Sequence, residues 1–477
     1  MTETMRSIDA AASEARTDFA PVAQEQRIHA LDIVRGFALL GIFVMNVEWF
    51  TRPTADLGRG IDPALHGMDY AVSWLVYVLV QGKFWTLFSL LFGMGFAVML
   101  GRAEHAGRRF VASYVRRIVM LFLLGSLHFM LIWTGDILHN YAIAALGLLM
   151  IVARSWKTWL VALLSLVATG LALRSPAVGA GLFFLVLVGV FMFFLHRGSL
   201  DRYWKFGVAA FSLPFAAMLA GSMVMAAMPQ QAAKPTQAEV QKREEAQKKY
   251  ITRRAEEVRI DSRGSYAEAV ADRAKQYAED LPGAAGLASA ALAMFLIGFW
   301  YVRSGIVGDL RRHLGLFKRL AAWALPLGLA MTLGALALHA PTFMPGQGKQ
   351  PSALAANGLF MWATLPMSLG YFSALVCLIH TGIGSKLLAP LRWAGQMALS
   401  NYIGASIIGT LFFFGYGLGY WEQVSRPGQM AFVLVVFALQ LVFSRLWLSK
   451  FRYGPLEWLW RAATYWQWPT LRRSALR

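Results

Sequence analysis

The sequence predicts an all-α protein, a polytopic transmembrane helix bundle of about 10–12 helices. Its 477 residues are 57% hydrophobic and only 15% charged. Apolar runs that approach the roughly 20 residues needed to cross the hydrocarbon layer recur along the chain. Basic residues gather in alternate connections between these runs, as is typical of multi-spanning proteins. An extracytoplasmic charged helical hairpin and a C-terminal interfacial amphipathic helix complete the expected fold.

The apolar runs predict twelve spans. We expect them at 31–51, 84–102, 115–134, 138–153, 157–174, 177–196, 205–227, 285–304, 318–338, 357–380, 397–416 and 428–448. Residues 68–82 are apolar as well, and form either an interfacial helix or an extension of the second span. The segment 157–196 holds either two spans or one broken span.

Charge sets the expected orientation. The net charge is +19, which in a soluble protein would suggest nucleic acid as a partner. Here cytoplasmic loops explain it, because such loops accumulate Lys and Arg; we therefore expect a lipid bilayer as partner and no nucleic acid. An even number of spans with basic inner loops places both termini in the cytoplasm. The polar first 26 residues contain no apolar signal core, so the first span is expected to serve as an uncleaved signal anchor.

Composition shifts divide the chain into five parts. These are a polar cytoplasmic tail (1–26), an N-terminal transmembrane bundle (27–228), a charged insert (229–284), a C-terminal transmembrane bundle (285–448) and a cytoplasmic interfacial tail (449–477). The insert contains two capping boxes, Thr236-x-x-Glu239 and Ser265-x-x-Glu268, which predict two helices. It is either a solvated spacer between the bundles or a lid over a site that opens outward.

Three polar residues occupy the first span, ALDIVRGFALLGIFVMNV. Ionisable groups inside a membrane are costly and face the bundle interior. At about 100° per residue, Asp32, Arg35 and Asn46 fall on one broad face of a helix. Asp32 and Arg35, near the cytoplasmic end, are candidate substrate-binding residues, and Asn46 is a candidate catalytic residue. The alternative is that Asp32 and Arg35 form an interfacial pair that merely orients the helix.

A second cluster lies in GSLHFMLIWTGDILHNYAIAALG, residues 125–147. Asp136 can cap the helix that follows it, and His139 and Asn140 come three and four residues later. His128 has no such local role. It is either a hydrogen-bonded core histidine or a general base oriented by a carboxylate. Neither HExxH nor CxxC spacing is present, so we expect no metal site.

Two further segments supply candidates. In QGKFWTLFSLLFGMGF, Lys83 either extends to the surface or binds an anionic group, and the glycines suit close helix packing. In GQMALSNYI, Asn401 offers an amide at the start of a helix. In the tail, Glu457 stands four residues before Arg461, a favourable helical pair.

Five blocks in this order resemble the YeiB family of bacterial inner-membrane proteins: RIHALDIVRGFALLGIFVMN, GKFWTLFSLLFGMGF, GSLHFMLIWTGDILHNYA, GQMALSNYI and LWLSKFRYGPLEWLWR. That family in turn resembles a wider superfamily of transmembrane acyltransferases that share the LD-x-x-RG opening. The resemblance implies a multi-pass inner-membrane protein, with Arg35 at an acyl-CoA entrance. Related polysaccharide enzymes carry a catalytic histidine where this chain has Asn46, an amide that cannot act as a base.

Three functions remain open from the sequence: an acyltransferase, a transporter, and a membrane scaffold that would need neither His128 nor Arg35. In an acyltransferase, acyl-CoA would be the donor substrate, no cofactor would be tightly bound, and the acceptor would be a glycan, lipid or small molecule. His128 would be the base, oriented by Asp136, with Asn46 or Lys83 polarising the thioester carbonyl. His139, Asn140 and Asn401 would contact substrate. In a transporter or exporter of a small solute or lipid, the same polar residues would line the path. Either of the first two functions requires one cavity that connects Arg35, Asn46, His128 and Asp136.

Overall fold

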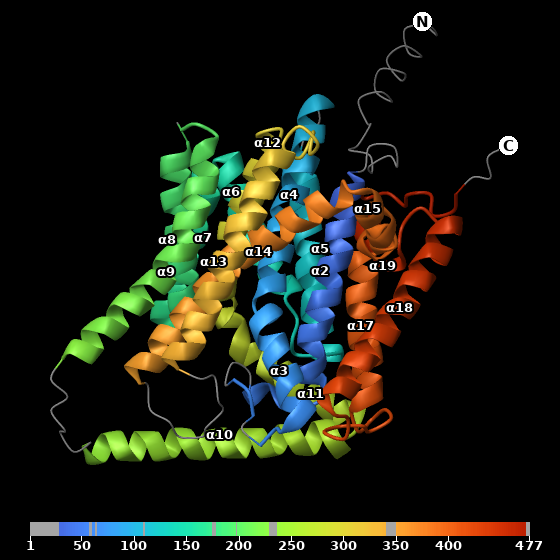
Figure 1. The fold of residues 1–477 in the computed structure, drawn as a ribbon. Coiled ribbons are helices and arrows are strands. Elements are labelled where there is room, and N and C mark those ends of the chain that lie inside the picture. Colours follow the sequence, from blue (N-terminus) through green and yellow to red (C-terminus); the bar gives the residue numbers. More distant parts are fainter. Residues whose placement is uncertain are drawn as a thin grey trace, which may run out of the picture.

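The computed structural model describes residues 28–56, 60–62, 64–107, 110–173, 178–196, 198–228, 236–339 and 350–473. Helices dominate these ranges, and many are long and apolar enough to cross a membrane (Figure 1). The predicted fold class is therefore confirmed.

The helices follow the predicted order along the chain. They are α2 (His29–Asn46), α3 (Gly67–Leu79), α4 (Lys83–His105), α5 (Phe110–Leu131), α6 (Leu138–Ala153), α7 (Trp156–Leu173), α8 (Val178–Leu195), α9 (Asp201–Ala227), α10 (Gln237–Arg263), α11 (Tyr266–Asp280), α12 (Ala284–Arg303), α13 (Leu314–Leu338), α14 (Pro351–Ile379), α15 (Gly382–Leu388), α16 (Leu391–Gln396), α17 (Ala398–Phe413), α18 (Arg426–Lys450) and α19 (Pro455–Tyr465).

Each of the twelve expected spans overlaps one helix of the structure. The segment 157–196 forms two helices, α7 and α8. Most of the segment 68–82 forms α3, which ends at Leu79, and Gly82 in the left-handed conformation (φ 79°) precedes α4. Apolar periodicity located these helices because each buries side chains or faces lipid along its whole length.

Helices α4 and α12 cross at the centre of the bundle, where glycines let the backbones touch. A Cβ on Gly93 would lie 2.5 Å from the Cα of Phe295, and one on Gly298 would lie 2.1 Å from the carbonyl oxygen of Leu90. Small residues allow this close approach between membrane helices. Gly95 differs, because nothing lies within 4 Å of the position that its Cβ would take.

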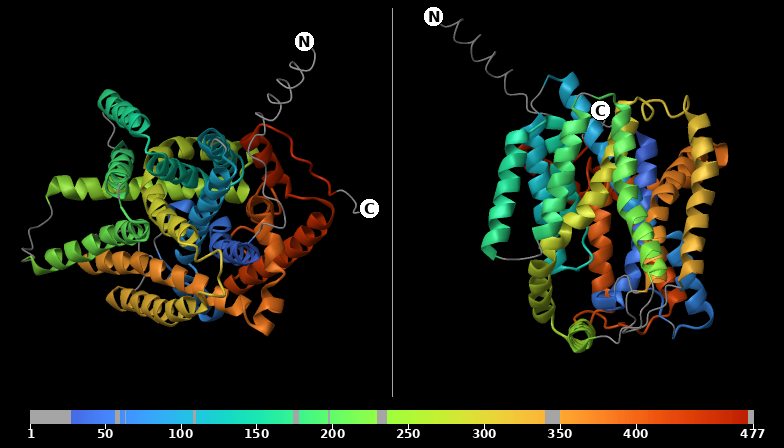
Figure 2. Two further views of the ribbon diagram at one scale, coloured as in Figure 1. Left: turned by 90° about the horizontal axis from the view of Figure 1, so that it is seen from above. Right: turned by 90° about the vertical axis from the view of Figure 1, so that its left-hand side faces the viewer.

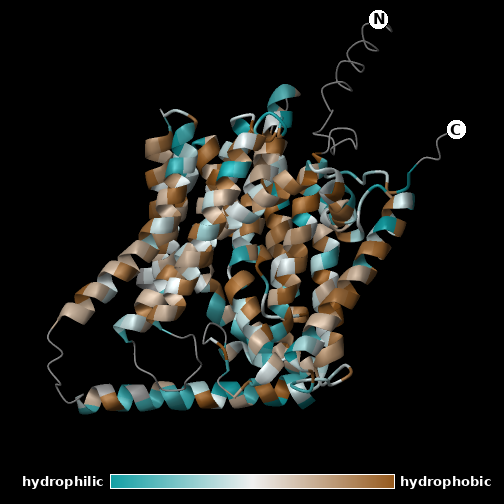
Figure 3. Cartoon of the chain, in the orientation of Figure 1, coloured by the Kyte–Doolittle hydropathy of each residue, from teal (hydrophilic) through white to brown (hydrophobic). Residues whose placement is uncertain are grey.

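The bundle has two distinct ends. Helix α10 runs across one end, roughly at right angles to the spanning helices, and α2 begins at the other end, near α19 (Figures 1 and 2). We call these the insert face and the α19 face. Hydrophilic residues follow α10 along its length, while brown, hydrophobic colour covers much of the spanning helices (Figure 3).

The insert forms two helices in contact, as its capping boxes predict. Ser265 and Glu268 make a complete capping box at the start of α11. Helix α10 starts at Gln237, directly after Thr236. Arg253 of α10 donates to both carboxylate oxygens of Asp272 in α11, at 2.6 and 3.0 Å.

The tail helix α19 packs on the bundle rather than standing apart from it. Trp460 donates to the carbonyl oxygen of Arg117 at 3.0 Å. The expected pairing of Glu457 with Arg461 is wrong. The Glu457 carboxylate instead accepts the backbone N–H groups of Leu399 and Ser400 at 2.7 and 3.0 Å, and the Ser400 hydroxyl at 2.5 Å. It caps α17 because unsatisfied N–H groups at a helix start favour a carboxylate over an exposed pair.

Candidate functional site

A buried His–Asp–His cluster lies where α5 meets α6. Asp136 Oδ1 is 2.9 Å from His128 Nδ1, and Asp136 Oδ2 is 2.9 Å from His139 Nδ1. Oδ2 also accepts the backbone N–H of His139 at 3.1 Å, so Asp136 caps α6 as the sequence suggests. The side chains of His128 and Asp136 are 0% exposed. His128 therefore faces the bundle interior and not lipid.

The hydrogen bonds fix the tautomer of each imidazole. An ionised carboxylate only accepts, so both histidines place a proton on Nδ1. The Asn140 amide Nδ2 lies 3.0 Å from His139 Nε2, which accepts its hydrogen. His128 Nε2 is buried and has no hydrogen-bond partner in the described part of the chain. A neutral His128 thus holds an unused, carboxylate-supported lone pair, which is the arrangement of a general base.

Gly125 of α5 allows this helix to pack closely against the start of α6. A Cβ on Gly125 would lie 2.4 Å from the backbone nitrogen of His139 and 2.8 Å from Asp136 Oδ2. Only the absence of that atom lets α5 approach the start of α6, which brings His128 within reach of Asp136.

Asp136 lies in the connection between α5 and α6, outside both helices. Burial acts to raise the pKa of its carboxyl group, but the hydrogen bonds and charges of His128 and His139 outweigh burial and lower the pKa below its ordinary value. Asp136 therefore stays ionised and can stabilise a protonated His128.

A cavity of about 250 Å³ opens near the α19 face and is lined by residues of α2, α4, α5, α17 and α19. Its lining includes four arginines, Arg35, Arg102, Arg117 and Arg461. Arg35 pairs with Asp32 at 2.6 Å. Among the described residues, Arg117 and Arg461 form no ion pair with a carboxylate. The guanidinium carbon of Arg117 lies 3.6 Å from the ring centroid of Trp460, and that of Arg461 lies 4.7 Å from the ring centroid of Tyr453. Such guanidinium groups can bind an anion.

Tyr402 separates the cavity from the cluster. It lines the cavity together with Ile137 and Leu138, which follow Asp136 directly. Its ring centroid lies 5.2 Å from that of His128, and its hydroxyl donates to the carbonyl oxygen of Gly135 at 3.4 Å. From the α19 face inward, the arginines of the cavity come first, then its apolar part, which we call the shaft and which includes Leu91 and Phe92, and then the cluster.

The expected single cavity is not found in the described residues. Asp32 and Arg35 line the large cavity, whereas Asn46 and Asn401 line a separate space of about 10 Å³ beside Tyr402. Asn401 donates to the carbonyl oxygen of Ala394 and the hydroxyl of Ser444, at 3.2 and 2.9 Å. Asn46 comes eleven residues after Arg35 in α2, and Ile42 and Tyr402 line both spaces.

Lys83 lies apart from this arrangement. Its side chain is fully buried, donates to the carbonyl oxygen of Tyr77 at 3.0 Å and sits 4.0 Å from the ring centroid of Phe360. It does not line the cavity. Lys83 therefore does not extend to the surface, and it lies outside the cavity because residues of α3 and α14 enclose it.

Sequence reasoning did not single out Tyr402, Arg117 or Arg461 as site residues. Tyr402 stands at an expected helix start, and Arg461 falls in the tail expected to lie at the membrane interface. Arg117 lies inside the expected span 115–134. A tyrosine beside Asn401 in an apolar helix was the available signal. Within the described ranges, no group of three or more His, Cys, Asp or Glu side chains is placed to hold a metal ion.

The chain is similar to known proteins over most of its length. Residues 301–467 match a family described as "Protein of unknown function (DUF418)". The chain is 29% identical to "Uncharacterized protein YxaH" of Bacillus subtilis over 95% of its own length and 98% of that protein. It is also 29% identical to "Uncharacterized protein YeiB" of Escherichia coli, over 92% and 96% of the two chains. No solved structure matches. The chain thus resembles the YeiB and YxaH proteins over nearly its whole length, and its long apolar helices indicate a multi-span membrane protein.

Proposed function

We propose that this chain is an integral membrane acyltransferase. It takes an acyl group from acyl-CoA at the α19 face and transfers it to an acceptor that approaches from the insert face. One observation carries the proposal: an arginine-lined cavity leads from the α19 face to Tyr402, whose ring contacts the buried His128 of the Asp136 cluster. Basic loops and the positive-inside rule support a cytoplasmic α19 face, in the bacterial inner membrane.

The cavity suits the two ends of such a donor. Arg117 and Arg461 offer guanidinium groups to phosphates, which Arg binds in a bidentate manner. The shaft beyond them is lined by apolar side chains such as Leu91 and Phe92, which suit the slender pantetheine arm. A thioester at the bottom of the shaft would meet Tyr402.

The chemistry requires one proton acceptor. The acceptor oxygen or nitrogen attacks the thioester carbonyl while its proton passes to His128 Nε2. Asp136 stabilises the imidazolium that forms. The tetrahedral intermediate then expels the thiolate of coenzyme A, which takes the proton from His128, so that base and carboxylate return to their starting state.

The experiment supplies acetyl-CoA labelled in the acetyl group to inverted membrane vesicles that contain the protein. We expect label in lipid, glycan or small-molecule acceptors with wild type, and strong loss with His128→Ala and Arg117→Ala. Matched controls are His105→Ala and Arg319→Ala, which change exposed residues outside the cavity. Absence of acyl transfer by wild type would refute acetyl transfer, and full activity of His128→Ala would refute the choice of base.

A second function is favoured by the placement of the cluster. Two histidines share one buried carboxylate between a cavity on one side and the insert on the other, which is an arrangement suited to a proton relay in a transporter. A proton-coupled transporter or exporter would move solute across sealed vesicles in response to a pH gradient, without acyl transfer. Flux that His128→Ala abolishes, with no label transfer by wild type, would favour this function.

A further inference from the structure

Helix α11 covers the His–Asp–His cluster from the insert face. The hydroxyl groups of Tyr277 in α11 and Ser126 in α5 lie 2.6 Å apart. The ring of Tyr277 packs edge-on against His139 and Phe129, at centroid distances of 5.7 and 5.2 Å. The side chain of Tyr277 thus covers His139, the histidine that is bonded to Asp136 Oδ2.

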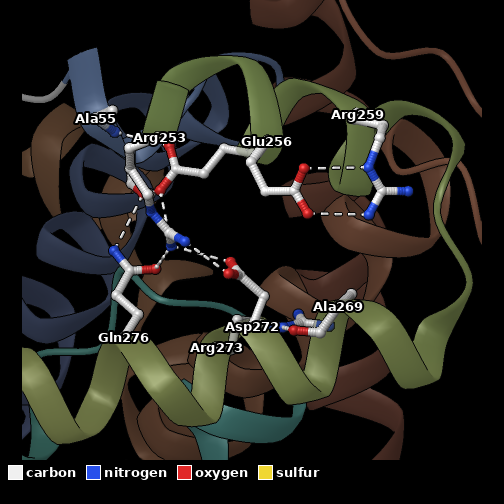
Figure 4. A network of polar contacts seen from close by, with 10 residues as sticks. Ala55, Arg253, Glu256, Arg259, Ala269, Asp272, Arg273 and Gln276 are labelled. Atoms are coloured by element: carbon white, nitrogen blue, oxygen red, sulfur yellow. Dashed lines mark hydrogen bonds and ion pairs between the residues drawn. The ribbon is translucent and has the colours of Figure 1, made fainter. Parts of the chain in front are cut away.

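Polar contacts hold the insert on the bundle. Glu257 of α10 accepts the Thr54 hydroxyl at 2.7 Å and the Ala55 backbone N–H at 2.9 Å. Gln276 of α11 donates to the Thr54 hydroxyl at 3.3 Å. Arg273 donates to the carbonyl oxygen of Ile132. Figure 4 shows Gln276 and Arg253 close to one another where α10 and α11 meet the segment around Ala55.

The insert is also braced internally, where Arg253 donates to Asp272 and to the Gln276 Oε1 at 3.2 Å. The bidentate bond between Arg253 and Asp272 joins α10 to α11 and involves no residue of the bundle. The two helices can therefore move as one body while the Thr54 contacts break. Glu257 and Arg273 are buried, and each hydrogen bond they make contributes about 0.5–3 kcal/mol, whereas the spanning helices interlock through large apolar contacts.

We infer that the α10–α11 insert is a lid over the acceptor route, with Tyr277 as the residue that closes it. The inference rests on the proposed function. A hydroxyl-bearing acceptor arrives at the insert face, displaces the phenol of Tyr277 from Ser126 and reaches the cluster past His139. The donor meets the same cluster from the opposite side, through the cavity, so the two substrates do not share an entrance.

The test compares two cross-links in the full-length protein with Cys377→Ala. Thr54→Cys with Gln276→Cys, joined by a short bis-thiol reagent, ties α11 to the bundle. Arg253→Cys with Asp272→Cys, joined by the same reagent, ties α10 to α11 and leaves the insert free to move. Each pair removes polar contacts of the insert, so each is compared with its own protein before cross-linking.

The first readout is carbethoxylation of His139 by diethyl pyrocarbonate, measured by mass spectrometry, with exposed His105 as the internal reference. We expect the bundle cross-link to slow His139 modification about tenfold or more, and the internal cross-link to leave it within about twofold, because only the first blocks opening. Tyr277→Ala should accelerate His139 modification and Tyr277→Phe should change it far less. Unchanged modification of His139 after the bundle cross-link would overturn the lid.

The second readout is label transfer from acetyl-CoA in the same preparations. The bundle cross-link should abolish transfer, and the internal cross-link should preserve it. Full transfer with the bundle cross-link would overturn the acceptor route. Slow modification of His139 in a protein whose wild type transfers no label would instead support the lid and refute the proposed function, so the two failures are distinguishable.

Discussion

Replacement of Asp136 tests the cluster most directly. Its carboxylate accepts three hydrogen bonds, from His128 Nδ1, His139 Nδ1 and the His139 backbone N–H. Asp136→Ala leaves three buried donors without partners, and each such group costs about 1–3 kcal/mol. Partial relaxation and rearrangement of the imidazole protons reduce the sum, so we expect a loss of about 3–5 kcal/mol, the lower part of that sum.

The assay is the free energy of unfolding in mixed detergent micelles at pH 7. Asp32→Ala is the matched control, because Asp32 accepts one contact from Arg35, whose side chain is 29% exposed; we expect that change to cost about 0–1 kcal/mol. If Asp136→Ala costs no more than Asp32→Ala, the cluster contributes nothing to stability and the described hydrogen bonds are not what holds α5 to α6.

Asp136→Asn separates stability from chemistry. The amide oxygen can take the place of Oδ2 and keep both bonds to His139, while the amide Nδ2 then faces His128 Nδ1. His128 must move its proton to Nε2 in order to accept from the amide, so its free lone pair is lost. We expect a cost of about 1–2 kcal/mol with near-complete loss of acyl transfer. Retained transfer would show that His128 Nε2 is not the base.

Three further changes test other parts of the structure. Glu457→Ala removes the cap of α17 and should lower the free energy of unfolding by about 1–2 kcal/mol, whereas Arg461→Ala should not, because the two side chains are not paired. Gly125→Ala should displace α5 from the start of α6, since the added Cβ meets the His139 backbone at 2.4 Å; we expect lower stability and faster carbethoxylation of His128, and an unchanged rate would contradict the close approach. Burial raises the pKa of Asp261, in α10, to about 7. A raised pKa in the folded state means that folding favours the protonated acid, so stability conferred by that proton is lost as pH rises from about 4 to 7. Asp261→Asn should flatten this slope in thermal unfolding between pH 5 and pH 8, and an unaltered slope would assign it to other groups.

The helices were predictable because their signal is local. Twelve expected spans match helices of the structure because a membrane helix must present apolar residues over its whole length, which a sequence window detects. Ser265 and Glu268 likewise form their capping box because its partners are three residues apart. The pairing of Glu457 with Arg461 failed for the converse reason: the N-terminus of α17 competes for the same carboxylate, and no local pattern reveals that competitor.

The sequence by itself determined that this chain is a helical membrane bundle with a charged insert, and it indicated that Asp136, His139 and His128 are polar groups of unusual placement. Only the tertiary structure decided that one carboxylate joins both histidines, that Tyr402 stands between them and an arginine-lined cavity, and that Tyr277 covers them from the insert. The physical reason is distance along the chain. Asp136 meets His139 within one helical turn, whereas Tyr402 and Tyr277 reach the cluster through packing of α17 and α11, which apolar periodicity does not encode.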